Sequence, residues 1–254
     1  MKKHLPNTLT CINLLCGCLA LTNIFRGDLV TGAYLVGIAA VADFFDGLLA
    51  RALRVSSPIG KDLDSLADMV SFGVVPGAIM FKLLSMTDGM SAVTVAGNVS
   101  YPSIFSLLPF GAFVITIFSA LRLAKFNNDT RQTTSFIGLP TPACTLVVAS
   151  LPLILAGDNF NLTGLILNPW LLLGLSVLLS GLLVAELPLF AMKFKNFRWL
   201  GNRRRFIFMV VSLVLVGWLR AAGVPIAVLL YVLMSVPGRV RSRDAAEPSP
   251  AGPQ

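Results

Sequence analysis

The chain has 254 residues, of which 56% are hydrophobic and only 13% are charged, and its mean hydropathy is +0.81. A soluble protein carries roughly 25% charged residues, so the composition excludes a large soluble domain and indicates an integral membrane protein. The net charge of +8 comes from short loops between apolar runs, which favours contact with anionic lipid and argues against nucleic acid as a partner.

Apolar runs alternate with short polar connections along almost the whole chain, and runs of about 18 to 20 apolar residues can cross a bilayer. We predict an all-α fold, a polytopic membrane helix bundle. Residues 1–238 are expected to form this bundle as one domain. Its eight expected transmembrane helices are residues 8–25, 29–49, 64–86, 103–124, 141–157, 169–191, 206–222 and 224–237. Residues 239–254 lack apolar periodicity and are expected to form a disordered tail.

The positions of the basic residues support an even number of spans. If both chain ends are cytoplasmic, all but three of the 20 Lys and Arg residues fall on the cytoplasmic side. The exceptions are Arg26, Lys82 and Arg220. Cytoplasmic loops of membrane proteins carry an excess of Lys and Arg, so we expect both termini in the cytoplasm. The basic loop 193–205 is expected to set this topology and to contact anionic lipid.

Cysteine and histidine offer few catalytic arrangements. The cysteines lie in apolar runs without the spacing of metal ligands, so zinc is not expected; they are Cys11, Cys16, Cys18 and Cys144. His4 is the single histidine, which leaves no Ser/His/Asp or Cys/His arrangement for nucleophilic catalysis.

Four aspartates occur where the second and third expected spans meet the cytoplasmic side. Asp43 and Asp46 end the second span, and Asp64 and Asp68 begin the third. Residues three or four apart share a helix face, and helices joined by a short loop are antiparallel neighbours. The two carboxylate pairs should therefore face each other, although an unpaired aspartate within a span costs at least about 2.5–3.5 kcal/mol.

Divalent cations would remove this repulsion, and oxygen ligands suit Mg²⁺ or Mn²⁺. Two such ions can clamp a phosphate or pyrophosphate, so we predict a two-metal site. Gly47 and, in the connecting loop, Gly60 leave room for a ligand near the backbone, and Arg51 can bind a phosphate with two hydrogen bonds. Interfacial ion pairs and an ion-transport path are alternative explanations of the same spacing.

The aspartates and their neighbours resemble the motif of a known family, the CDP-alcohol phosphatidyltransferases. All eight fixed positions of that motif occur here at the family's spacing: Asp43, Asp46, Gly47, Ala50, Arg51, Gly60, Asp64 and Asp68. The resemblance covers residues 5–145, the expected catalytic core. It is closest to the membrane-type, serine-using branch in LPNTLTCINLLCG (5–17), GKDLDSLADMVSFGVVPG (60–77), LRLAKFN (121–127) and FIGLPTPA (136–143).

This resemblance implies transfer of the phosphatidyl group of CDP-diacylglycerol to the hydroxyl of L-serine, with release of CMP. It implies that all four aspartates bind the metal ions and that Asp68 also acts as the general base. The family's nucleotide contacts carry over to Gly47, Ala50, Arg51 and Gly60. A homodimer is the usual assembly in the family and is expected here.

Three further features have two interpretations each. Arg122 and Lys125 begin the next cytoplasmic loop and are expected to bind the serine carboxylate or the lipid phosphates, although the topology pattern alone also explains them. Asn13 faces the nucleotide entrance or forms an interhelical hydrogen bond. Gly73 and Gly77 form a GxxxG pair, which permits close helix packing and is a candidate dimer contact.

Two alternative functions remain at this point. The first is the same chemistry with another acceptor, such as glycerol phosphate, inositol phosphate or another amino alcohol. The second is an ion-coupled transporter, which is less favoured because the chain has no internal repeat and the aspartates lie at one membrane edge. The expected location is a bacterial cytoplasmic membrane, with the active site facing the cytoplasm.

Overall fold

The computed structural model describes residues 5–53, 55, 57–87, 92–95, 99–102, 104–128, 136–158, 160–189 and 199–235. His4, the predicted tail 239–254 and residues 193–198 of the basic loop therefore lie outside the described residues. The first elements are α1 (Leu5–Phe25), α2 (Leu29–Leu53), α3 (Pro58–Asp68), the π-helical turn η1 (Met69–Val74), α4 (Val75–Thr87), β1 (Ala92–Val95) and β2 (Val99–Pro102). The later ones are the 3₁₀ helix η2 (Ile104–Phe113), α5 (Val114–Asn128), β3 (Phe136–Ile137), α6 (Thr141–Gly157), α7 (Thr163–Ile166), α8 (Pro169–Val184), β4 (Pro188–Leu189), α9 (Trp199–Leu219), η3 (Arg220–Ala222) and α10 (Gly223–Ser235).

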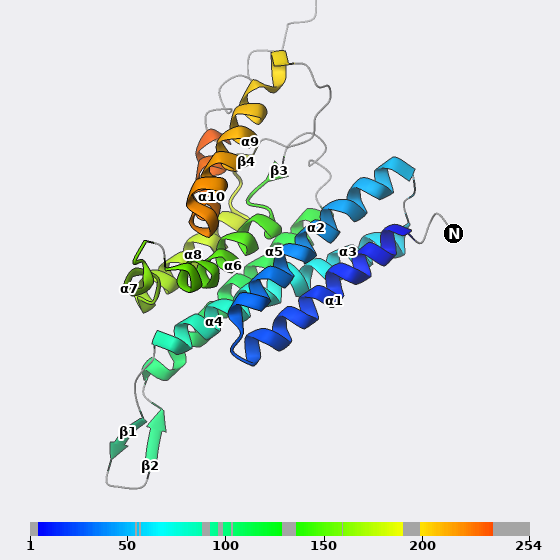
Figure 1. Cartoon of the computed structure of the whole chain (residues 1–254). Coiled ribbons are helices and arrows are strands. Elements are labelled where there is room, and N and C mark those ends of the chain that lie inside the picture. Colours follow the sequence, from blue (N-terminus) through cyan, green and yellow to red (C-terminus); the bar gives the residue numbers. More distant parts are fainter. Residues whose placement is uncertain are drawn as a thin grey trace, which may run out of the picture.

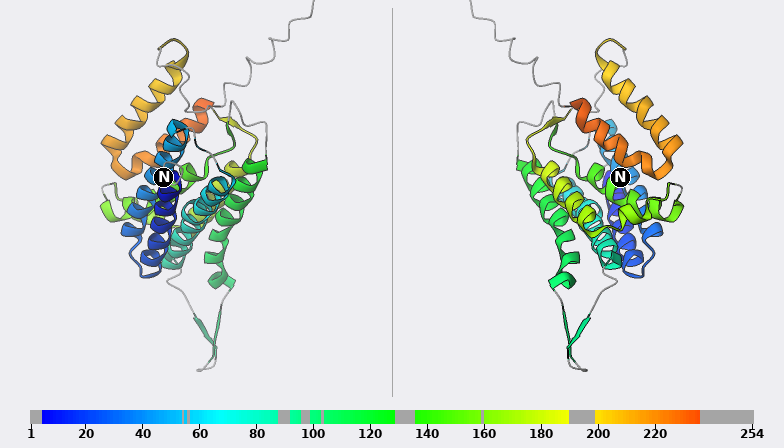
Figure 2. Two further views of the ribbon diagram at one scale, coloured as in Figure 1. Left: turned by 90° about the vertical axis from the view of Figure 1, so that its right-hand side faces the viewer. Right: turned by 90° about the vertical axis from the view of Figure 1, so that its left-hand side faces the viewer.

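The helices form one bundle, as the composition predicts. α1 and α2 are an antiparallel hairpin in which α1 packs along α3 and α4 and α2 packs against α6, while α5 and α8 pack against each other and against α4 (Figure 1). Fully buried aliphatic side chains from four of these helices meet in the core, including Val36, Ile79, Ile115 and Leu172. α9 and α10 form a separate hairpin at one end (Figure 2), where α10 contacts α6.

The chain is an integral membrane protein with an all-α bundle. Five described segments are long and apolar enough to cross a membrane: Leu5–Phe25, Leu29–Leu53, Pro58–Thr87, Leu107–Asn128 and Arg205–Ser235. The apolar helices α6 and α8 are shorter than these. The predicted spans 206–222 and 224–237 correspond to the two arms of the last segment, which η3 separates. The short antiparallel pairs β1–β2 and β3–β4 were not predicted, and they do not alter the helical architecture.

Both helices that carry the aspartates are longer than predicted. α2 continues to Leu53, and α3 begins at Pro58. Ser57 caps α3, because its Oγ accepts a hydrogen bond from the backbone N–H of Gly60 at 3.0 Å. A capping serine followed by proline at the first helical position is a typical helix start. The prediction that Gly60 lies in the connecting loop is therefore wrong, because Gly60 lies in the first turn of α3.

A π-helical turn interrupts the third span directly after Asp68. Pro76 has no N–H to donate to the carbonyl of Phe72, four residues earlier. Just before Pro76, the N–H of Val75 bonds to the carbonyl of Val70, five residues back, and not to a carbonyl four residues back as in an α-helix. Turns of this kind occur frequently at functional sites, and here the turn leaves a backbone carbonyl in need of another partner.

Threonines of neighbouring helices satisfy the carbonyls of this turn. Thr145 of α6 donates its hydroxyl to the carbonyl oxygen of Phe72 at 2.9 Å, and Thr116 of α5 donates to that of Gly73 at 3.0 Å. A Cβ added to Gly77 would collide with the Thr116 hydroxyl. The close helix packing predicted at the GxxxG pair therefore occurs within the chain, between α4 and α5. The homodimer stays a prediction, and the Gly77 surface does not support it because α5 covers that surface.

Candidate active site

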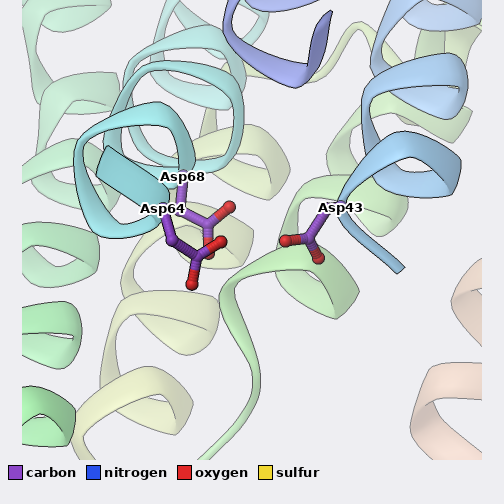
Figure 3. A group of neighbouring side chains, drawn as sticks. All are labelled: Asp43, Asp64 and Asp68. Atoms are coloured by element: carbon purple, nitrogen blue, oxygen red, sulfur yellow. The ribbon is translucent and has the colours of Figure 1, made fainter. Parts of the chain in front are cut away.

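Three of the four aspartates come together between α2 and α3. One carboxylate oxygen each from Asp43, Asp64 and Asp68 lies within 4.8 Å of the other two. Figure 3 shows Asp43 on one side and Asp64 and Asp68 on the other, with the carboxylates turned toward one another. The four-residue spacing places Asp64 and Asp68 on one face of α3, so that both face α2. All three side chains are half-buried.

Asp46 lies beside this group but is not part of it. Its side chain is buried, and its Oδ2 accepts a hydrogen bond from the Thr10 hydroxyl at 2.7 Å. Asp46 and Asp64 both line the pocket described below. The sequence predicted that all four aspartates bind the metal ions. The structure places three of them in direct proximity, and the fourth accepts a hydrogen bond from α1.

The group of three carboxylates suits a divalent cation. At about 4–5 Å, two like charges repel by roughly 3–4 kcal/mol at an effective dielectric constant near 20. None of the four aspartates forms a salt bridge with another of the described residues. The ligands available are oxygens alone, which Mg²⁺ and Mn²⁺ prefer, so the residues present fit the predicted ion.

A pocket of about 250 Å³ opens next to the carboxylates. It extends between the start of α1, the last turns of α2 and the first turns of α3. Three of the four predicted nucleotide contacts line it, namely Gly47, Ala50 and Gly60, whereas Arg51 is not among the lining residues. A Cβ built on Gly47 would lie 3.8 Å from an Arg51 guanidinium nitrogen, so the Arg51 side chain lies beside the pocket's glycine.

The pocket offers several features that bind anions. The start of α3 carries partial positive charge, and Ser57 and Gly60 line the pocket there, where the Gly60 N–H donates to the Ser57 hydroxyl. Lys61 adds a full positive charge, and Asn7 and Thr10 of α1 add polar groups. The pocket is thus lined by both carboxylates and a basic side chain, a combination that suits a cation-bound phosphate.

Helix α5 lies beside the carboxylate site. Asn127 donates from its Nδ2 to the Oγ of Ser65 at 2.8 Å, and Lys61 donates from Nζ to the Asn127 carbonyl at 3.3 Å. Because Ser65 directly follows Asp64, these bonds bring the end of α5 next to the residues that carry the carboxylates.

The two basic residues predicted to bind substrate differ in environment. Arg122 is 5% exposed, its guanidinium lies 5.2 Å from the centre of the Phe126 ring, and its buried Nε has no hydrogen-bond partner among the described residues. Lys125 is more exposed and forms a salt bridge of 3.1 Å with Glu186. Arg122 is therefore a buried cation with unused hydrogen-bonding capacity, whereas Lys125 already has a partner.

Sequence reasoning missed one residue and left another undecided. Asn13 of α1 donates from Nδ2 to Asp68 Oδ1 at 3.2 Å, so it forms the interhelical bond that was one of its two interpretations. Thr10, which binds Asp46, was not singled out. A possible signal was that Thr10 and Asn13 are polar residues three apart in an apolar helix, which places them on one face.

Comparisons with known proteins identify the family to which the chain is similar. Residues 3–181 match the CDP-alcohol phosphatidyltransferase family. The CDP-diacylglycerol–serine O-phosphatidyltransferase of Bacillus subtilis is 31% identical over 170 residues, which are 65% of this chain and 87% of that protein. The protein of that name from Helicobacter pylori is 30% identical over 213 residues, 83% of this chain and 80% of that one. The one from Saccharomyces cerevisiae is 34% identical over 115 residues, 42% and 35% of the two chains.

Proposed function

The chain belongs to the CDP-alcohol phosphatidyltransferase family, and we propose that it transfers the phosphatidyl group of CDP-diacylglycerol to L-serine. The products are phosphatidylserine and CMP. The observation that carries this proposal is the convergence of Asp43, Asp64 and Asp68 beside a pocket lined by the motif residues Gly47, Ala50 and Gly60. The names of the similar proteins support serine as the acceptor.

In this proposal the aspartates hold one or two divalent cations, Mg²⁺ or Mn²⁺. Asp43, Asp64 and Asp68 supply the converging oxygens, and Asp46 supplies its carboxylate from the pocket side. Such ions, when bound, neutralise phosphate charge and stabilise the oxygens that attack and leave during displacement at phosphorus.

Asp68 is the proposed general base. An alcohol has a pKa far above 7, so its proton must be accepted as its oxygen attacks the phosphorus. The Asp68 carboxylate accepts one hydrogen bond from Asn13 through Oδ1, which leaves Oδ2 to take the hydroxyl proton. CMP carries away the electron pair of the broken P–O bond, so no covalent enzyme intermediate is needed.

The pocket is the proposed site of the nucleotide. Gly47 and Gly60 have no side chain that would fill it, and Ala50 has a small one. Lys61 lines the same space, and its positive charge, together with the partial positive charge at the start of α3, suits the diphosphate of CDP-diacylglycerol. Arg51, from beside Gly47, is proposed to contact a phosphate. The lipid chains would then extend into the bilayer from the cytoplasmic end of the bundle, in the proposed setting of a bacterial cytoplasmic membrane.

The acceptor is proposed to bind near α5, through Arg122 and, less directly, Lys125. A buried guanidinium with unused donors can bind a carboxylate or phosphate by two parallel hydrogen bonds. We expect Arg122→Lys to raise the KM for serine about tenfold or more, because hydrogen bonds to charged groups contribute roughly 1.5–3 kcal/mol. Steady-state kinetics with serine and CDP-diacylglycerol varied in turn would measure this.

Lys125→Ala is the matched comparison, and it is expected to change the KM for serine less, since Lys125 is paired with Glu186. If Arg122→Lys instead raised only the KM for CDP-diacylglycerol, Arg122 would bind lipid phosphate. An unchanged KM for both substrates would remove Arg122 from the site.

The proposed activity is tested with purified protein in mixed micelles that contain CDP-diacylglycerol. We expect CMP release that requires serine and Mg²⁺ or Mn²⁺, stops on addition of EDTA, and is accompanied by formation of phosphatidylserine. Parallel reactions with glycerol phosphate, inositol phosphate and ethanolamine identify the acceptor. Faster turnover with one of these acceptors would show that this compound, and not serine, is the acceptor. No CMP release with any acceptor would contradict the proposed function.

A further inference from the structure

Helix α1 supplies two hydrogen-bond donors to the aspartates, one to α2 and one to α3. We propose that Thr10 and Asn13 are positioning residues, which fix the carboxylates of Asp46 and Asp68 in the orientation that cation and substrate require. This inference rests on the proposed function for the roles of the aspartates, and it assigns to α1 a part in the active site that the family motif does not contain.

The geometry places each donor on a different carboxylate. The Thr10 hydroxyl donates to Asp46 Oδ2 at 2.7 Å, and Asn13 Nδ2 donates to Asp68 Oδ1 at 3.2 Å. Thr10 and Asn13 are three residues apart and share one face of α1, which packs against both α2 and α3. One face of one helix therefore holds one carboxylate from each of the two helices that form the site.

Contacts that involve no carboxylate fix the position of α1. The Ser71 hydroxyl donates to the backbone carbonyl of Asn13 at 3.0 Å, and a Cβ added to Gly17 would collide with that same hydroxyl. The packing of Gly17 against the Cα and Cβ atoms of Ser71, which an alanine at position 71 would keep, sets the height of α1 along η1. The two donors are thus held in place independently of the carboxylates, as positioning residues must be.

Packing alone does not explain the choice of asparagine at position 13. The side chain is 0% exposed, and its Oδ1 has no hydrogen-bond partner among the described residues. An unpaired buried acceptor destabilises a fold, and a leucine of similar size would avoid it. The feature that leucine lacks is the amide N–H that binds Asp68.

Each hydrogen bond occupies one oxygen of its carboxylate and restricts rotation of the side chain. In this proposal the other oxygen, Oδ1 of Asp46 or Oδ2 of Asp68, is left for the cation or the substrate. Partners of this kind orient the ligands of a metal ion, and their loss typically lowers metal affinity or activity by about 10- to 100-fold.

The test compares substitutions that remove a donor with ones that keep it. Thr10→Val keeps the shape of the side chain but removes the hydroxyl, and Thr10→Ser keeps the hydroxyl. Asn13→Leu removes the amide. Ser71→Ala removes a hydrogen bond at the same helix crossing without touching a carboxylate. For each variant, Mn²⁺ affinity is measured by electron paramagnetic resonance without substrates, together with kcat, the KM values and the midpoint of thermal unfolding.

We expect Thr10→Val and Asn13→Leu to lower Mn²⁺ affinity or kcat by about 10- to 100-fold, with the KM for serine little changed. Thr10→Ser should stay close to the wild type, and Ser71→Ala should lower only the unfolding midpoint. Wild-type Mn²⁺ affinity and kcat in both donor-free variants would overturn the inference, as would losses that Ser71→Ala reproduces. A wild-type protein that binds Mn²⁺ in a Thr10-dependent way but releases no CMP would contradict the proposed function alone.

Discussion

Replacing Asp68 with asparagine is expected to lower kcat by about 10²- to 10⁴-fold, the usual contribution of a general base. Asparagine has nearly the same shape, and its amide oxygen can still accept the hydrogen bond from Asn13. It cannot take the proton of the attacking hydroxyl. Release of CMP at saturating serine and Mg²⁺ would measure the loss, and Mn²⁺ binding in the same variant should fall far less than kcat.

Asp62→Asn is the matched control, because Asp62 lies on the same helix, is exposed and undergoes the same change of charge. It should retain the wild-type rate. An Asp68→Asn variant with a kcat within about threefold of the wild type would show that the proton goes elsewhere, since general bases contribute far more than that.

The second large effect is expected from removal of a carboxylate that binds the cation. Asp43→Ala and Asp64→Ala should each weaken Mn²⁺ binding by more than about 100-fold, beyond the range for residues that only orient a ligand. The rate of CMP release at a fixed Mg²⁺ concentration should fall together with the metal affinity. Electron paramagnetic resonance of Mn²⁺ and CMP release measure the two quantities.

The same variants should change stability in opposite directions with and without the ion. Without a cation, loss of one carboxylate relieves repulsion of roughly 3–4 kcal/mol per pair, so Asp64→Ala should raise the unfolding midpoint in EDTA. With Mn²⁺ present, the wild type gains the free energy of binding, and the order should reverse. An Asp64→Ala variant that is less stable than the wild type by the same amount in both conditions would argue against a cation site at this cluster.

Much of the fold and the site could be predicted because simple patterns determine them. Apolar runs of spanning length specify a helical membrane protein. The three- and four-residue spacings of the aspartates place each pair on one helix face. The short connection between α2 and α3 keeps the aspartate-bearing ends of those helices close together, while α1 packs against both helices. The convergence of Asp43 with Asp64 and Asp68 follows from these rules.

Other features depend on contacts between distant segments, which no local pattern encodes. The hydrogen bond between Thr10 and Asp46 joins residues 36 positions apart. The π-helical turn after Asp68 combines a local cause, Pro76, with the threonines of α5 and α6 that satisfy its carbonyls. The early start of α3 was different, since Ser57 and Pro58 are a local signal that could have been used.

The location of bound Mn²⁺ tests the central claim most directly. Anomalous diffraction from crystals grown with Mn²⁺ and CDP-diacylglycerol should show a strong peak in contact with carboxylate oxygens of Asp43, Asp64 and Asp68. It should lie next to the diphosphate of the lipid. A refined complex with nucleotide bound and Mn²⁺ located only away from these three side chains would contradict the account.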